Sequence, residues 1–454
     1  MTRDSWSGRA GFILATIGSA VGIGSIWKFP YELGANGGSG FLLFYVLGLV
    51  AVVVPLMFAE FAIGQRGRAD AAASLEAVAR EAGASPRWRW AGAFGVLAGF
   101  LILSYYAVIG GWTLAYAART AVQGLPAATA GAAQARFDAF LAEPWAMLGW
   151  HALFMAATAW VVARGVAGGI EAASKVLMPV LFALMAVLVT YAAVAGDLRA
   201  TVAFLFEPRL DRIGPRTALE ALGLGFFSIG VGLGLMITFA AYSTSRVGLV
   251  QVALVSVLAD TAISLMAGFM VFPIVFAHGL DPASGPGLVF VTMPIAFARL
   301  PLGTAAAAGF FLLLGVAALA SAISKLELVV ALLVRVLGWP RPRTTLAAAL
   351  ACFALGVPTV LSFNLWADWH PLAFVPTFAK ATFFDLIDEL TSNAMLPLGG
   401  LAIAVFAGHV MTRQLLGDAL GVRARGAKWL AFALRWLAPA LIVLTALAPL
   451  LGVR

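Results

Sequence analysis

The chain has 454 residues, of which 62% are hydrophobic and 11% are charged, whereas a soluble globular domain carries roughly 25% charged residues. Together with a mean hydropathy of +0.98, this composition excludes an ordinary soluble domain and indicates a polytopic membrane protein. The formal net charge of +8 requires no nucleic-acid partner, because loops on the inner side of a membrane are enriched in Lys and Arg. The single cysteine, Cys352, excludes an internal disulfide.

Eleven apolar segments are long enough to cross a bilayer as helices, which takes about 20 residues at about 1.5 Å each. They lie near residues 10–32, 38–64, 90–120, 144–163, 174–195, 219–243, 247–277, 303–334, 345–365, 381–411 and 428–452. If the N-terminus is cytoplasmic, the inner loops hold seventeen Lys and Arg residues and the outer loops eight. This asymmetry fits the positive-inside rule and places the C-terminus outside.

The first segment is too long for a cleavable signal peptide, and it runs into Lys28 and Pro30 without a small-residue cleavage site. Between spans, the composition of residues 66–89 predicts a surface helix. The proline-containing segment 280–302 is expected to fold as a lid on the outer side.

Two glycine-rich runs interrupt the first and sixth spans, GSAVGIGS at residues 18–25 and SIGVGLG at residues 228–234. Glycine costs roughly 1 kcal/mol per residue in a helix, so these runs predict backbone that is no longer helical. Unpaired backbone groups within a bilayer are tolerated only where they line a cavity or a ligand. A matched pair of such breaks points to the midplane site of a secondary transporter.

The breaks also predict what binds between them. Helix N-termini carry roughly half a positive charge, so the amides near residues 22–24 and 230–234 would attract a carboxylate. Unwound carbonyls at Gly18, Ala20 and Val21 would attract a cation. A zwitterion together with a sodium ion satisfies both requirements.

Motifs along the whole chain resemble the neurotransmitter:sodium symporter family, whose bacterial members include leucine and tryptophan transporters. The matching residues are Trp6, Gly8, Gly11-Phe12, the run 18–31, Asn36-Gly37-Gly38, Pro55-Leu56-Met57, Glu60, Tyr105-Tyr106, Gly111-Trp112, Gly169-Ile170-Glu171, Met178-Pro179, Phe226-Phe227, Tyr242, Ala267-Gly268, Pro273, Leu326-Glu327 and Asp388.

This resemblance implies an all-α fold of 11 transmembrane helices in a single domain over residues 1–454. Inverted repeats of five helices would cover about 9–195 and 217–412, with an extra helix at about 428–452 and helices 1 and 6 unwound at the midplane. The implied protein is a monomer or homodimer of the bacterial inner membrane. It takes up an amino acid or related zwitterion by alternating access, driven by sodium, with no enzymatic activity, no organic cofactor and no nucleic-acid partner.

By the same resemblance, the substrate site collects residues from four spans. They are Ser19, Ala20, Gly22, Gly24, Ile102, Tyr106, Phe227, Ser228, Gly230, Leu233, Ser321 and Lys325. The Tyr106 hydroxyl would bind the substrate carboxylate, and Phe227 would cover the site from outside. Amine transporters of the family carry an aspartate at the position of Gly22, so glycine favours a substrate with its own carboxylate.

Two sodium sites carry over from the family. The first would consist of Ala20, Ser25, Ser228 and Asp260, and the second of Gly18, Val21, Ala317 and Ser321. Oxygen ligands suit a hard cation. Ser25 replaces the usual asparagine, and Ala320 replaces a second hydroxyl or carboxylate, which predicts a weakened second site.

The family's chloride pocket would contain Tyr45, Ser228 and Ser264, but Leu224 stands in place of its usual glutamine. Asp260 stands where many members have asparagine. A carboxylate there would supply the negative charge of chloride, so transport is predicted to be chloride-independent.

The gates depart from the family pattern. Lys28 replaces the arginine of the outer gate and is expected to pair with Asp388 as a point charge. At the inner gate, near Tyr242, Arg3 would face Arg335 in place of an aspartate. That inner salt bridge cannot form, so another residue must close the inside.

Lys325 lies one helical turn beyond Ser321, where relatives carry a small or apolar residue. A lysine in mid-span marks a function or a partner. Three interpretations are open: it binds a second negative charge of an acidic substrate, its ammonium replaces the second sodium and titrates during transport, or it pairs with Glu327 or another intramembrane acid.

Two further acids receive structural interpretations. Glu60 is expected to accept hydrogen bonds from backbone or hydroxyl groups near the first helix break, and Glu171 with Lys175 is expected to form an exposed helix pair. The main rival to a sodium symporter is a proton-coupled or sodium-reduced transporter of an acidic substrate. A non-transporting amino-acid sensor is a further alternative.

Overall fold

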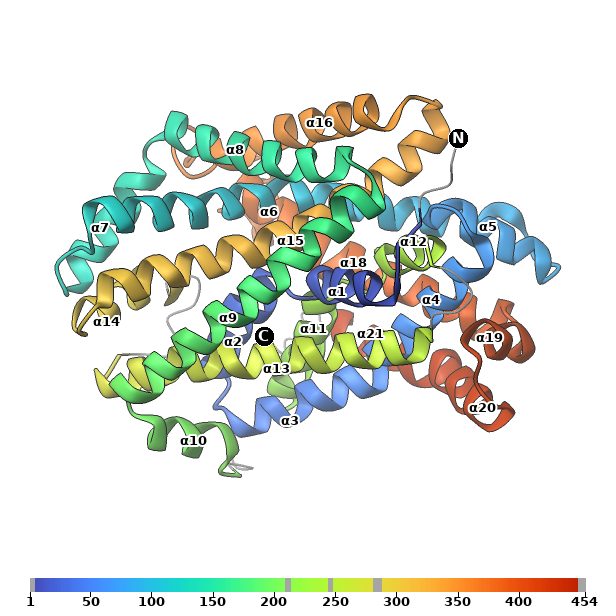
Figure 1. Cartoon of the computed structure of the whole chain (residues 1–454), viewed down its shortest axis with the longest axis horizontal. Coiled ribbons are helices and arrows are strands. Elements are labelled where there is room, and N and C mark those ends of the chain that lie inside the picture. The colour runs from blue at the N-terminus through green and yellow to red at the C-terminus, as the bar shows by residue number, and fades with distance from the viewer. Residues whose placement is uncertain (1–4, 209–213, 244–247, 281–287, 448–454) are drawn as a thin grey trace.

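A computed structural model of the chain describes residues 5–208, 214–243, 248–280 and 288–447. Within these ranges every regular element is a helix, and no strand occurs. The long helices run roughly side by side in one bundle, with α5 and α19 at one end and α7 and α14 at the other (Figure 1). The all-helical prediction is therefore confirmed.

The α-helices are α1 (Arg9–Ala20), α2 (Phe29–Ala35), α3 (Ser39–Gly48), α4 (Val54–Gly67), α5 (Ala71–Glu81), α6 (Arg89–Gln123), α7 (Ala130–Leu141), α8 (Pro144–Ala163), α9 (Ala172–Ala195), α10 (Leu198–Phe206), α11 (Pro215–Ile229), α12 (Leu235–Ala241), α13 (Leu249–Ala277), α14 (Met293–Ala298), α15 (Gly303–Leu337), α16 (Arg341–Leu361), α17 (Phe383–Asp388), α18 (Leu396–Val405), α19 (Arg413–Leu420), α20 (Ala424–Phe432) and α21 (Ala438–Leu447). Short π-helical turns join several of them without a break, as between α3 and α4 and between α20 and α21.

Within the described residues, nine continuous helical stretches are long and apolar enough to cross a membrane. A tenth candidate is the pair Arg9–Ala20 and Gly24–Ala35, which is bent by 52°. The expected sixth span is divided into α11 and α12, each too short to cross alone. The multi-pass architecture is confirmed, and the total of eleven spans stays a prediction.

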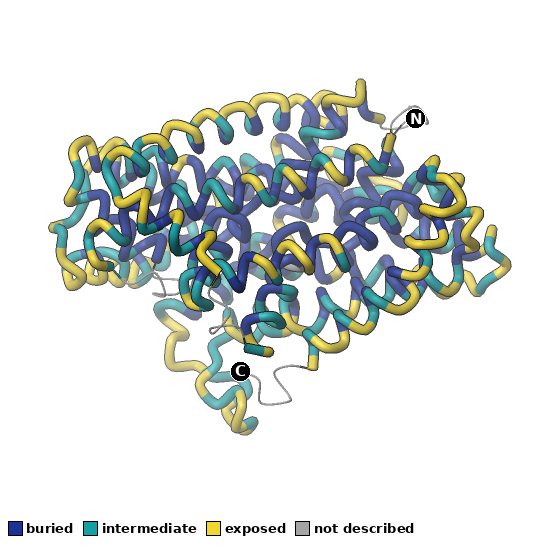
Figure 2. Tube along the Cα trace, turned by 90° about the horizontal axis from the view of Figure 1, so that it is seen from below, coloured by how far each residue is buried: buried dark blue, intermediate teal, exposed yellow. Residues whose placement is uncertain are grey.

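Burial separates a central group of helices from a peripheral one (Figure 2). The two 35-residue helices α6 and α15 pack along each other and are mostly buried. Helices α8, α9 and the α20–α21 stretch expose large apolar side chains, among them Trp160 and Trp436. Exposed tryptophans on such helices suit contact with lipid, so the site must lie among the central helices.

Both predicted helix breaks are present. Helix α1 ends at Ala20, and Val21 is extended with φ −78° and ψ 120°; the helix resumes with the π-helical turn Gly24–Lys28. Helix α11 ends at Ile229 and α12 begins at Leu235. The turn between them carries positive φ values of 70°, 94° and 83° at Gly230, Gly232 and Gly234, which other residues adopt only with strain.

The same turn lies directly against α18. A Cβ atom added at Gly232 would lie 2.5 Å from the backbone nitrogen of Gly400, and Gly399 faces Gly232 from the other side of the contact. Glycine therefore serves two purposes here: it permits the turn, and it allows two backbones to touch.

The two connecting segments fold as helices. Within residues 66–89, α5 forms as predicted, and its N-cap Asp70 accepts from the backbone N–H groups of Ala72 and Ala73. One face of α5 is buried against α4 and α6. Of the predicted lid, Pro282 and Pro286 lie outside the described residues, whereas Leu288–Ala298 is a buried helical stretch whose Phe290 packs against Trp27.

Candidate functional site

A small cavity, with a volume of about 20 Å³, lies where the two helix breaks meet. Its lining residues are Ser19, Gly22, Gly24, Ile102, Tyr106, Ser228, Ile229, Gly230, Leu233, Ser321, Lys325 and Leu396. Ten of the twelve residues expected at the substrate site line it. Ala20 lies outside the lining, the side chain of Phe227 lies outside the described part of the chain, and Ile229 and Leu396 were not expected.

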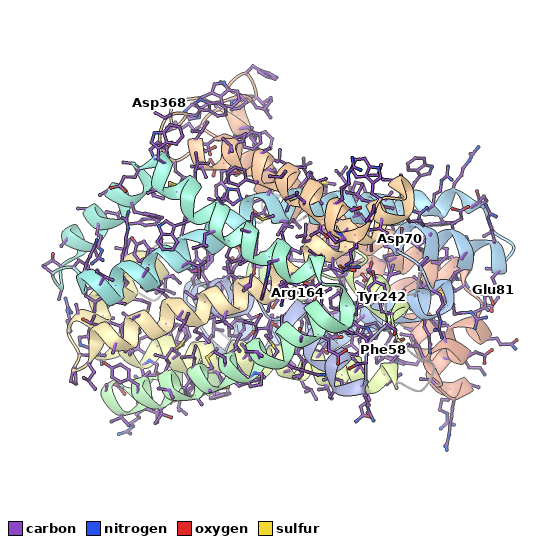
Figure 3. All side chains as sticks on the ribbon, turned by 45° about the horizontal axis from the view of Figure 1, so that its top comes forward. Phe58, Asp70, Glu81, Arg164, Tyr242 and Asp368 are labelled. Carbon is purple, nitrogen blue, oxygen red and sulfur yellow. The ribbon has the colours of Figure 1, made fainter. Side chains whose placement is uncertain are left out.

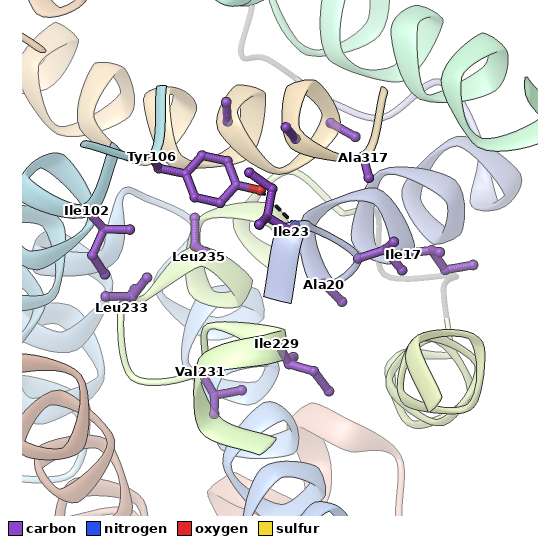
Figure 4. Close-up of a cluster of buried hydrophobic side chains, with 14 of the residues drawn as sticks. Ile17, Ala20, Ile23, Ile102, Tyr106, Ile229, Val231, Leu233, Leu235 and Ala317 are labelled. Atoms are coloured by element: carbon purple, nitrogen blue, oxygen red, sulfur yellow. Dashed lines mark hydrogen bonds between the residues drawn. The ribbon is translucent and has the colours of Figure 1, made fainter. Parts of the chain in front are cut away.

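Tyr106 connects α6 to the first break. Its hydroxyl oxygen accepts from the backbone N–H of Ile23 over 3.2 Å (Figure 4). A Cβ atom at Gly22 would lie 2.8 Å from that hydroxyl oxygen and 3.1 Å from Ser321 Oγ. A larger residue at position 22 would therefore fill the space between these two hydroxyls. Ile102 and Leu233 lie near Tyr106 and supply apolar wall (Figure 4).

A second polar cluster surrounds Asp260 on α13. Its carboxylate accepts from Ser25 Oγ over 2.5 Å, from Ser228 Oγ over 3.1 Å and from Tyr45 Oη over 3.3 Å. The two serine hydroxyls also lie 2.9 Å apart. Asp260, Ser25 and Tyr45 are all fully buried. The structure thus brings three of the four residues expected at the first sodium site into direct contact, with one negative charge among them.

The residues expected at the second sodium site lie on α1, at its end, and on α15. These helices pack closely, because a Cβ atom at Gly18 would lie 3.4 Å from that of Ala320. The hydroxyl of Ser321 reaches toward the carbonyl of Ser19 over 3.5 Å. Val21 and Ala317 are both fully buried. The coordination of an ion by the carbonyls of Gly18, Val21 and Ala317 stays a prediction.

Lys325 extends along α15 into the cavity. Its Nζ donates to Ser321 Oγ over 2.6 Å and lies 4.5 Å from the centre of the Tyr106 ring. Only 8% of the residue is exposed. The structure does not support the interpretation of a pair with Glu327, because Lys325 forms no ion pair with any described carboxylate.

Glu60 on α4 holds the second break in place. One carboxylate oxygen accepts from the backbone N–H of Gly232 over 2.6 Å, and the other accepts from that of Met236 over 3.0 Å. Glu60 is fully buried. The carboxylate thus satisfies amides at the start of α12 that have no partner within the helix. The predicted role as a hydrogen-bond acceptor is confirmed, but its location is corrected: Glu60 accepts at the second break and not near the first.

Aromatic side chains of Trp6, Phe239 and Tyr242 pack together near α12. The Trp6 indole N–H donates to the carbonyl of Phe239 over 2.8 Å, and its backbone N–H donates to that of Tyr242 over 3.2 Å. The Trp6 ring packs edge-on against Phe239 and Tyr242. Toward the other side, Asp388 accepts from Ser392 Oγ over 2.8 Å. The pairing of Lys28 with Asp388 stays a prediction.

Two ion pairs that the sequence analysis missed lie at the end of the molecule that carries Tyr242. Arg335 pairs with Asp70, and Arg341 pairs with Glu327, whose carboxylate also accepts from the Tyr242 hydroxyl over 2.7 Å. Asp70 and Tyr242 lie on the same side of the bundle (Figure 3). Arg335 thus has an acidic partner on α5, while Arg3 lies outside the described residues.

The prediction that Glu171 and Lys175 form an exposed pair is only partly right. The ion pair is present, with Nζ and Oε1 2.7 Å apart, but the Glu171 side chain is 1% exposed and that of Lys175 is 50% exposed. The carboxylate is buried because it also accepts from the backbone N–H and the hydroxyl of Ser7. Glu171 therefore ties the start of the chain to the π-helical turn Val166–Glu171.

Broken helices that enclose a buried polar cavity, within a bundle of bilayer-spanning helices, define a secondary membrane transporter. A model of the Sodium:neurotransmitter symporter family matches residues 3–138 and 142–448. The chain belongs to this family, which consists of transporters and not of enzymes.

Known relatives agree with this assignment. The uncharacterized sodium-dependent transporter YhdH of Bacillus subtilis (strain 168) is 38% identical over 403 residues, which cover 88% of this chain and 86% of that protein. The sodium-dependent dopamine transporter of Bos taurus is 27% identical over 422 residues, covering 80% and 59% of the two chains. The crystal structure of MhsT in complex with L-phenylalanine superimposes with a TM-score of 0.88 at 39% identity and covers 98% and 99% of the two chains.

Proposed function

We propose that this transporter takes up an amino acid together with sodium and that it does so without chloride. The observation that carries the proposal is the cavity between the two helix breaks, where the hydroxyl of Tyr106 lies beside the backbone N–H of Ile23. Oriented hydroxyl and amide donors suit a substrate carboxylate. The similar transporter MhsT, whose structure is titled as a complex with L-phenylalanine, supports an amino acid as the substrate.

Gly22 supports the same class of substrate. An aspartate at this position would place a negative charge between the hydroxyls of Tyr106 and Ser321, where it would repel a carboxylate. With glycine there, the carboxylate of the substrate can approach the hydroxyl of Tyr106 without that repulsion. We therefore propose a carboxylate-bearing zwitterion and exclude simple amines.

Sodium would enter as a co-substrate, and the cluster around Asp260 fits it. A carboxylate and two serine hydroxyls in mutual contact form an oxygen-only donor set, which is what a hard cation prefers. Bound there, sodium would neutralise a carboxylate that has no basic partner among the described residues. Ser25 directly follows the first break, and Ser228 directly precedes the second. Sodium binding to both serines would therefore couple the movements of the two breaks.

The fixed charge of Asp260 is also the basis for chloride independence. Its carboxylate lies 3.3 Å from Tyr45 Oη and 3.1 Å from Ser228 Oγ, the hydroxyls that the resemblance assigns to a chloride pocket. Two like charges so close together would repel by several kcal/mol in a medium of low dielectric constant. A chloride ion next to Asp260 is thus disfavoured.

Uptake into proteoliposomes tests the proposal. We expect radiolabelled amino acid to accumulate under an inward sodium gradient, and uptake to be unchanged when gluconate replaces chloride. Tyr106→Phe removes one hydrogen bond to a charged group, which is worth about 1.5–3 kcal/mol, so the apparent affinity should fall at least about tenfold. A clear rise of uptake with chloride at constant sodium would refute chloride independence, and binding without accumulation would indicate a sensor.

A further inference from the structure

Tyr106, Ser321 and Lys325 bring two hydroxyl groups and an amino group together on one wall of the cavity. Tyr106 Oη accepts from the backbone N–H of Ile23, so its own proton remains for a ligand. Ser321 Oγ accepts from Lys325 Nζ over 2.6 Å and donates to the carbonyl of Ser19 over 3.5 Å. The ammonium of Lys325 uses one of its three protons in this contact.

No described acid supplies a counter-charge at this wall. None of the residues that line the cavity carries a carboxylate. The buried acids nearby are engaged elsewhere: Asp260 accepts from three hydroxyls, Glu60 accepts from the amides of α12, and Glu327 binds Tyr242 and Arg341. A buried ammonium without an anionic partner is unfavourable, and an acidic group of a ligand would supply that partner.

We propose that Lys325, with Ser321 beside it, is an anion subsite that selects substrates carrying a second acidic group. The inference rests on the proposed function, which already assigns the first carboxylate to Tyr106 and the amides of the broken helices. A neutral zwitterion leaves the ammonium of Lys325 unpaired, whereas aspartate or glutamate brings the side-chain carboxylate that completes the site. The substrate class is therefore a small acidic amino acid.

The position of the ammonium favours this role over replacement of an ion. Nζ lines the cavity itself and lies over the face of the Tyr106 ring, 4.5 Å from its centre. An aromatic face stabilises a cation without neutralising it. The ammonium is thus held on the cavity wall, beside the position proposed for the second carboxylate.

Pairs of ligands that differ only in charge provide the test. Purified protein in sodium buffer is titrated with L-aspartate, L-glutamate, L-asparagine and L-glutamine, and apparent affinities are taken from the ligand-induced rise in melting temperature. We expect each acid to bind at least about tenfold more tightly than its amide, as the loss of a charge-assisted hydrogen bond implies. In Lys325→Met the preference should disappear or reverse.

Lys175→Met is the matched control, because Lys175 is half exposed and lies far from the cavity lining; it should keep the preference for acids. The inference is overturned if the amides bind as well as the acids, if none of the four ligands stabilises the protein, or if Lys325→Met keeps the ratio. It is also overturned if this variant instead gains a second sodium requirement.

The two proposals fail in different ways. Sodium-driven accumulation of glutamine with no preference for glutamate would refute the proposed anion subsite and would still support sodium symport. Tight binding of glutamate without accumulation would refute sodium symport and would still support the proposed anion subsite.

Discussion

Asp260 and Lys325 are both buried, both charged and both close to a helix break, yet their surroundings are opposite. The carboxylate of Asp260 accepts from three hydroxyls, whereas the ammonium of Lys325 has one hydroxyl acceptor and the face of an aromatic ring. The first group is already supported by the protein before anything binds. The second depends on its ligand for an anionic partner.

This difference separates two tasks that a transporter must perform. A carboxylate that already accepts several hydrogen bonds can hold a small ion of fixed chemistry, since its geometry is set in advance. An incompletely solvated ammonium discriminates among larger ligands, because a ligand without the right charge leaves it unpaired. Three substitutions of acidic residues test this comparison. They ask whether the loss of transport or stability depends on how many hydrogen bonds the carboxylate accepts and on how deeply it is buried.

The largest effect is expected from Asp260→Ala. The substitution removes the only charged group of its cluster and leaves the hydroxyls of Ser25, Ser228 and Tyr45 without their acceptor. Each unsatisfied buried group costs about 1–3 kcal/mol, so sodium-dependent uptake should fall at least about a hundredfold. Ser256→Ala, a buried serine on the same helix outside this cluster, serves as control. Normal sodium affinity in Asp260→Ala would show that the ion binds elsewhere.

A smaller effect, on stability, is expected from Glu60→Ala. The backbone N–H groups of Gly232 and Met236 lose a charged acceptor inside the protein, at about 1.5–3 kcal/mol for such bonds. The melting temperature in detergent should fall by several degrees, as about 1 kcal/mol shifts it by roughly 2–4 °C in chains of a few hundred residues. Glu60→Gln keeps one acceptor oxygen and should lose less. Equal stability of both variants and the parent would contradict a supporting role.

The smallest effect is expected from Glu81→Gln. This variant removes the charge of an acid that is hydrogen-bonded but exposed, and so separates the effect of burial from that of hydrogen bonding. Glu81 is as well partnered as Asp260, because Arg66 Nε donates to it over 3.0 Å, but its side chain is 40% exposed. The hydrogen bond from Arg66 lowers the pKa of Glu81. The pair therefore stabilises the protein above the ordinary glutamate pKa, and this contribution is lost as pH falls through the lowered value.

Exposed pairs contribute about 0–1 kcal/mol, so Glu81→Gln should shift the melting temperature by no more than a few degrees at neutral pH and not at all once Glu81 is protonated. A fall in melting temperature as large as that of Glu60→Ala would mean that hydrogen-bond partners matter more than burial, and would contradict the comparison.

The features that local chemistry dictates could be predicted from the sequence. Glycine runs located both breaks, because the preference of glycine for positive φ and its low helix propensity do not depend on the rest of the chain. The prediction that Ser25, Ser228 and Asp260 lie together came from the resemblance to a family and not from spacing. Family membership itself is confirmed over nearly the whole chain.

What could not be predicted depends on contacts between distant segments. Asp70 shows the ordinary signature of an N-cap residue, and it does cap α5, but its pairing with Arg335 requires knowing that α5 and α15 meet. The burial of Glu171 likewise depends on Ser7, which lies 164 positions away. Excess positive charge near Arg335 and Arg341 was the only available signal, and it does not name a partner.

The contact between Gly232 and α18 has a mechanical consequence. No side chain separates the turn from the backbone at Gly399 and Gly400. A displacement of the turn therefore cannot be absorbed by a change of side-chain conformation. Close-packed interiors transmit strain, so a shift of the turn is passed on to α18 without slack. Leu396, on the preceding turn of that helix, lines the cavity, so a displacement of the turn would also displace one wall of the cavity.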